Sequence, residues 1–264
     1  MSNNQYIQLA TASVLSSICL IFFSCKGSKT YKDFKDEAEL NQFLTARGYI
    51  IKTNGGKSAG QIESVKITKS TLYESGDFKI ICTIPTLKQI VFESADVHNL
   101  REDGLSFCAN ISGLEFYFRK VKLNEEQICE ISEKTRESKP SFYFSNTNLN
   151  DNMLNCLMKI HTMQSFGADV AYEITEDAVC KLSQKITSVT YFGLSEAPFS
   201  RRALECIFSL PNLNFVFLQH WSQVPGQEIY DLLHEYENRH GRKLESVIDD
   251  PTSIDSTVWP KENQ

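Results

Sequence analysis

Six cysteines recur along the chain about 25 residues apart: Cys82, Cys108, Cys129, Cys156, Cys180 and Cys206. Cysteine thiols can ligate a metal, form disulfides, act as nucleophiles or fill a core. Metal ligation requires clustered ligands such as C-x-x-C, and the sequence contains no such cluster. Equivalent positions on neighbouring packed helices are expected about 8–10 Å apart, whereas a disulfide needs Cα atoms within about 7 Å. We therefore expect a ladder of small buried side chains with inert thiols, which suits a reducing compartment. The alternative is one off-register disulfide or a metal site.

Two other segments contain residues that could bind phosphate or zinc. Residues 55–58 read Gly-Gly-Lys-Ser, but a phosphate loop requires a glycine where Ile51 stands. His234-Glu235 and His240 are similar to a zincin helix, yet these histidines are six residues apart, and two ligands on one helix face need a spacing of four. The remaining histidines are isolated in sequence: His98, His161 and His220. We expect no catalytic residue, no metal and no small-molecule cofactor. The alternative is a hydrolase whose histidines and carboxylates are brought together by the fold.

A short alternating apolar run precedes each of these cysteines at the same interval and is predicted to be a strand. A short helix is expected after each run. Three of these helices have similar starts, in which Asn124, Asn150 and Thr175 precede acidic residues. Asn and Thr can cap a helix, and acids complement its positive end. Equivalent strand positions are predicted at Ile67, Phe92, Phe118, Phe144, Ala168, Tyr191 and Leu218.

This unit resembles the leucine-rich repeat, which runs L-x-x-L-x-L, a turn, a further apolar residue and a helix. The best match is residues 142–151, and the resemblance covers about residues 60–235, with Phe, Ile and Val where Leu is usual. It implies an α/β solenoid of about seven repeats, with a parallel sheet on the concave face and short helices on the convex face. The alternative is a non-repeating α/β fold.

The chain divides into five predicted segments. Residues 1–25 are a signal peptide or apolar anchor, and residues 26–59 are a linker with a capping helix from Asp33 to Arg47. The repeats occupy residues 60–225. A second capping helix, from Glu228 to His240, lies in residues 226–248, and residues 249–264 form a flexible tail.

The amino end contains an uncharged apolar stretch over residues 7–23. It is short for a membrane span and suits a signal peptide better. Residues 20–25, Leu-Ile-Phe-Phe-Ser-Cys, resemble the lipobox of bacterial lipoproteins, in which the signal is cut before a cysteine that is then lipidated. The resemblance implies a protein of the bacterial cell envelope, held to a membrane by a lipid on Cys25. The alternatives are another form of export, simple anchoring, or an uncleaved apolar helix on a cytoplasmic protein.

The charge and the predicted sheet indicate the kind of partner. A formal net charge of −6 argues against nucleic acid, because phosphate binding needs a basic face. Alternate strand residues should point onto the concave face, where we expect Tyr117, Arg119, Tyr143, Phe192 and Phe217. Protein interfaces favour aromatic side chains with an arginine nearby. We therefore expect a protein-binding scaffold rather than an enzyme. The alternative is a purely structural spacer without an exposed apolar patch.

Overall fold

The structure, a computed structural model, describes residues 31–54, 60–72, 74–97, 105–170, 172–221 and 223–248. The predicted signal segment with Cys25, the Gly-Gly-Lys-Ser segment, His98 and the predicted tail lie outside the described residues. In the part of the chain that is described, no helix is long and apolar enough to cross a membrane.

Strands and helices alternate along the chain, and the strands form one open, mostly parallel sheet whose order follows the sequence. β1 pairs antiparallel with β2, and every later pair is parallel. The α/β class is therefore confirmed, whereas β1 and β9 at the two edges were not predicted. The strands are β1 (Ile50–Thr53), β2 (Ile62–Thr68), β3 (Gln89–Glu93), β4 (Glu115–Arg119), β5 (Ser141–Ser145), β6 (Ser165–Asp169), β7 (Tyr191–Ser195), β8 (Phe215–Gln219) and β9 (Glu245–Ile248).

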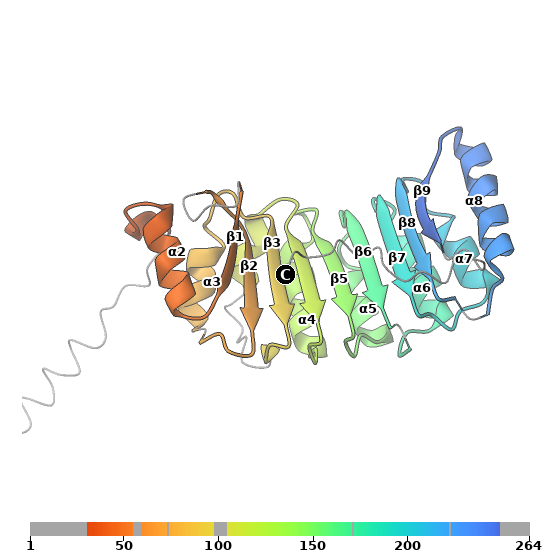
Figure 1. Cartoon of the computed structure of the whole chain (residues 1–264). Helices are drawn as coiled ribbons and strands as arrows, with labels where there is room; N and C mark the ends of the chain where they lie inside the picture. The colour runs from red at the N-terminus through yellow and green to blue at the C-terminus, as the bar shows by residue number, and fades with distance from the viewer. Residues whose placement is uncertain are drawn as a thin grey trace, which may run out of the picture.

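The helices that follow the strands cover one face of the sheet, and α2 and α8 lie at its two ends (Figure 1). Both end helices occur where capping helices were predicted. The predicted helix starts are also confirmed, because the side chains of Asn124, Asn150 and Thr175 each accept a hydrogen bond from a backbone N–H of the first turn. The helical elements are η1 (Tyr31–Asp33), α2 (Glu37–Ala46), α3 (Ser75–Ile81), η3 (Leu105–Asn110), α4 (Glu125–Thr135), α5 (Asp151–Leu157), α6 (Glu176–Lys185), α7 (Arg201–Ile207) and α8 (Gly226–His240).

The core lies between the sheet and the helices and is built from side chains in register across the strands. Phe92, Phe118 and Phe144 occupy equivalent positions on β3, β4 and β5, and their rings stack with centroids 5.1 and 5.3 Å apart. These separations are close to the spacing of neighbouring strands, so identical side chains in register stack naturally. A further apolar residue lies between strand and helix in each unit. At the first of these positions Leu72 is exposed, whereas the others are buried: Val97, Leu123, Leu149, Ile174, Phe199 and Val224.

A left-handed residue follows each of the strands β3 to β8, with φ between 48° and 62°. In three of the turns, the N–H of this residue donates a hydrogen bond to the carbonyl of the last residue of the next strand. The donors are Ser94, Lys120 and Glu196, and the respective acceptors are Arg119, Ser145 and Gln219. The same turn therefore recurs from unit to unit. These residues are Ser94, Lys120, Asn146, Val170, Glu196 and His220.

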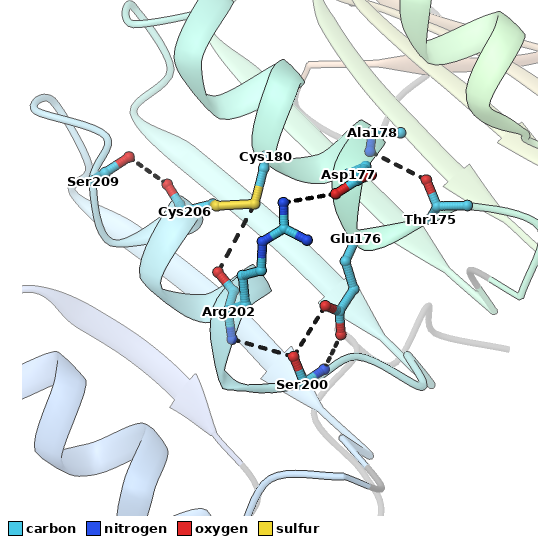
Figure 2. Close-up of a disulfide and its surroundings, with 9 residues drawn as sticks. All are labelled: Thr175, Glu176, Asp177, Ala178, Cys180, Ser200, Arg202, Cys206 and Ser209. Carbon is cyan, nitrogen blue, oxygen red and sulfur yellow. Dashed lines mark hydrogen bonds and ion pairs between the residues drawn. A yellow bond between two sulfur atoms is a disulfide. The ribbon is translucent and has the colours of Figure 1, made fainter.

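The expectation of free, buried thiols is wrong. Three disulfides join cysteines of consecutive units: Cys82–Cys108, Cys129–Cys156 and Cys180–Cys206, with Cα atoms 4.8, 4.7 and 5.0 Å apart. Figure 2 shows the third, which joins α6 and α7. The prediction took the separation of helix axes for that of Cα atoms. Cα atoms lie about 2.3 Å from each axis, so facing residues on helices 8–10 Å apart come within about 3–5 Å.

Candidate binding face

The sheet face opposite the helices, called here the open face, carries three rows of outward side chains. The pairing register places one residue of each strand in the central row, from β2 to β8: Lys66, Val91, Tyr117, Tyr143, Gly167, Gly193 and Phe217. A second row, toward the strand starts, includes Glu115, Tyr191 and Phe215. The third row, toward the strand ends, includes Arg119, Ser145, Asp169 and Ser195.

An aromatic array, consisting of Tyr117, Tyr143, Tyr191 and Phe215, crosses the open face from β4 to β8. Tyr117 and Tyr143 stack with ring centroids 4.4 Å apart, and Tyr191 and Phe215 stack at 5.1 Å. Between the two stacks, the rings of Tyr143 and Tyr191 meet edge to face at 5.7 Å and 71°. Both arrangements are favourable geometries for aromatic pairs. The three tyrosine side chains are half-buried, although they lie on the side of the sheet that no helix covers.

Two adjacent glycines interrupt the central row next to this array. A Cβ atom on Gly167 would lie 3.0 Å from the ring of Tyr143, and one on Gly193 would lie 3.3 Å from the ring of Tyr191. The rings therefore occupy space that larger residues at these positions would fill. The glycines leave a pocket whose walls include Tyr143, Tyr191 and Phe217.

The polar rim of the pocket is organised around Asp169, at the end of β6. One carboxylate oxygen accepts a hydrogen bond from Ser145 Oγ at 3.1 Å, and the other accepts one from Ser195 Oγ at 2.7 Å. These serines are its register partners on the two flanking strands. Arg119 is two strands away in the same row, with its guanidinium carbon 5.8 Å from the centre of the Tyr117 ring.

The hydroxyl groups of the array stay protonated at neutral pH. Burial raises the pKa of Tyr117, and the nearby Glu115 carboxylate, which accepts its hydrogen bond at 3.1 Å, raises it further. Burial also raises the pKa of Tyr143, and it raises that of Tyr191 to about 12. Because ionisation is disfavoured in a partly desolvated site, the array presents neutral rings and hydroxyl groups that can donate hydrogen bonds.

Four of the five predicted binding residues have side chains on the open face: Tyr117, Arg119, Tyr143 and Phe217. The placement of Phe192 is wrong, because its side chain is 1% exposed and packs against Phe166 in the core. The residue of β7 that is equivalent to Phe144 is Leu194, whereas the prediction placed Tyr191 there. The predicted register of β7 is therefore wrong by three residues, an odd number, which reverses the side on which each residue lies. Tyr191 therefore points outward in place of Phe192, and Tyr191 and Phe215 are the two residues of the array that the prediction missed.

The glycine pair was also missed as a feature of the face. A glycine inside a strand signals close approach by another group, and that signal was present at Gly167 and Gly193. The prediction did not recognise the two glycines as a pair. They are neighbours across the sheet only in the correct register of β7, and the predicted register was wrong.

The two histidines that were compared with a zincin helix, His234 and His240, contact other residues of α8. His234 lies 3.4 Å from a Glu237 oxygen, one turn along α8, and the ring of His240 stacks on Tyr236 at 4.3 Å. In the described ranges, no group of three or more His, Cys, Asp or Glu side chains is arranged to hold a metal ion.

Comparison with known proteins adds no functional assignment. No family model matches the chain, and no curated protein matches its sequence. The geometry of the open face is therefore the basis on which a function can be proposed.

Proposed function

We propose that the chain is a protein-binding scaffold built as a leucine-rich-repeat solenoid, with the open face as its concave, partner-binding surface. The recurring unit supports the repeat: a strand, a left-handed residue, a buried apolar residue and a helix. Sheet order that follows chain order supports the stacking of units, in which neighbours bury each other's apolar sides.

The aromatic array carries the functional part of this proposal. Tyrosines provide large, rigid contact area with a polar tip and are enriched at the centres of protein interfaces. Here three of them, with two phenylalanines, lie on the sheet face that no helix covers, beside a pocket with a polar rim. A purely structural spacer has no need for such a patch.

Partner capture by face variants tests the proposal. The full chain, immobilised, is exposed to an envelope extract of the source organism, and retained proteins are identified by mass spectrometry. Tyr143→Ala and Phe217→Ala should lose a partner that the unaltered chain retains. Phe107→Ala is the matched control, because Phe107 is 40% exposed but belongs to η3 on the helical side. Equal retention by all three variants would refute the open face as the binding surface.

We further propose that the chain is a lipoprotein of the bacterial cell envelope, anchored through Cys25. A reducing compartment was expected because the cysteines were taken to be free thiols. The three disulfides favour an oxidising compartment instead. This agrees with the lipobox-like run at residues 20–25. A cytoplasmic protein would be expected to keep these thiols reduced.

Thiol labelling and intact mass test the location. In a bacterial host expressing the full reading frame, Cys25→Ala should move the protein out of the membrane fraction and remove the acyl mass. Alkylation of the denatured protein should modify the six repeat cysteines only after reduction. A soluble species that retains Met1 and has reactive thiols would overturn the envelope proposal while leaving the binding face untouched.

A further inference from the structure

The pocket beside the aromatic array has a floor without side chains. Gly167 on β6 and Gly193 on β7 are register partners, and in the same row Tyr143 and Phe217 stand on the strands to either side. At about 4.8 Å per strand spacing, the backbones that carry these two walls are roughly 14 Å apart. The Tyr143 ring leans over Gly167, which narrows the space further. A slender aliphatic chain suits such a floor better than a bulky group.

A carboxylate lies at one end of this floor. Asp169 follows Gly167 by two residues on β6, and two serine hydroxyls hold its carboxylate. Within the part of the chain that the structure describes, no lysine or arginine forms an ion pair with Asp169. Arg119 is the register partner of Glu93 on β3, and its charge contributes to lowering the pKa of Glu93, after the larger effect of Lys66.

The walls of the pocket also favour a cation. The Tyr143 and Tyr191 rings meet at 71°, so they form a corner rather than a flat platform. The electron-rich faces of aromatic rings attract ammonium and guanidinium groups within about 6 Å. The array already provides one example, since the Arg119 guanidinium lies over the Tyr117 ring at 5.8 Å.

We propose that this pocket binds a lysine side chain of the partner polypeptide, with its alkyl chain over Gly167 and Gly193 and its ammonium group at Asp169. The inference rests on the proposed function, because it takes the partner to be a protein at the open face. It adds the chemistry that the partner must present. An anionic group would find a carboxylate at the rim, and a neutral apolar group would make no use of it.

Two short peptides test the inference directly. Acetyl-Gly-Gly-Lys-Gly-Gly-amide and its norleucine counterpart differ in the ammonium group, and binding to the full chain is followed by the ring signals of isotope-labelled tyrosines in NMR titrations. The lysine peptide should bind about tenfold more tightly than the norleucine peptide, because norleucine cannot form the cation–π contact or the ion pair. Asp169→Asn should reduce lysine binding to the level of norleucine, while Asp177→Asn, away from the open face, should not. Arg119→Gln should strengthen it by removing a like charge.

Several results would overturn the lysine inference. These are equal affinity for both peptides, no detectable binding of the lysine peptide at millimolar concentration, and tighter lysine binding by Asp169→Asn than by the unaltered chain. If any of these occurs while Tyr143→Ala still abolishes partner capture, the binding face stands and only the lysine pocket falls. If capture survives Tyr143→Ala and Phe217→Ala, the proposed function falls as well.

Discussion

At Val170 the backbone has a conformation that a β-branched side chain disfavours. Its φ of 62° is left-handed, as in the equivalent turn at Asn146, where φ is 52°. Asparagine tolerates this region far better than valine. Val170→Asn should therefore stabilise the fold by about 1 kcal/mol, measured as the free energy of unfolding in denaturant.

The control for this prediction is Val91→Asn, in the middle of β3, where the extended backbone suits valine. That change should destabilise the protein by roughly 0.5–1 kcal/mol. A loss of stability at both positions would mean that the packing of the half-buried Val170 side chain outweighs the backbone strain.

The observed register of β7 predicts how much stability the protein loses when single phenylalanines are replaced. Phe192 is buried and its ring lies 5.3 Å from that of Phe166, so Phe192→Ala should cost about 3–5 kcal/mol of unfolding free energy. Phe217, outward on β8, should lose less than about 1 kcal/mol on the same change. Equilibrium denaturation of the two variants measures both values, and similar losses would contradict the register.

At the scale of elements, the helix starts of neighbouring units are linked to each other (Figure 2). Glu176, in the first turn of α6, accepts hydrogen bonds from both the backbone N–H and the Oγ of Ser200, the N-cap of α7. Its neighbour Asp177 forms an ion pair with Arg202 in which both side chains are more than half exposed. Glu176→Ala should therefore cost about 1–2 kcal/mol, because it leaves the start of α7 without its acceptor.

Asp177→Ala is the matched control, since it removes a second acid from the same helical turn. An exposed ion pair contributes little, so the loss should stay near 0.5 kcal/mol. Thermal or denaturant unfolding of the two variants separates the effects. Equal losses would show that the acids act only through the positive end of α6, and not through the link to α7.

The elements were predictable from the sequence where a local signal defined them. Helix starts at Asn124, Asn150 and Thr175 carry their own capping chemistry. Strands β2, β3 and β5 have apolar residues at alternate positions, which defined their register. In β7, Tyr191-Phe192-Gly193-Leu194 can be interpreted as apolar in either phase, and a slip reverses the side of every residue. β1 and β9 gave no comparable signal, because their residues are mostly half-exposed edge positions.

At the scale of the whole molecule, the disulfides divide the chain into linked pairs of units. The bonds join the C-cap residue of α3 to η3, α4 to α5, and α6 to α7. No disulfide among the described residues therefore crosses from one pair to the next. The sequence contained the even spacing but not the pairing, since that depends on how closely the helices approach. Each bond closes a loop of nearly equal length, with separations of 26, 27 and 26 residues.

Equal loop lengths lead to a prediction about stability. If the bonds act by restricting the unfolded chain, removing any one of them should cost about the same, roughly 2–4 kcal/mol. The variants are Cys82→Ala/Cys108→Ala, Cys129→Ala/Cys156→Ala and Cys180→Ala/Cys206→Ala, compared by denaturant unfolding without reductant. Losses at such separated sites should also add when two pairs are removed together. A much larger loss for the central pair would mean instead that its bond holds the two halves of the molecule together in the native state, beyond its effect on the unfolded chain.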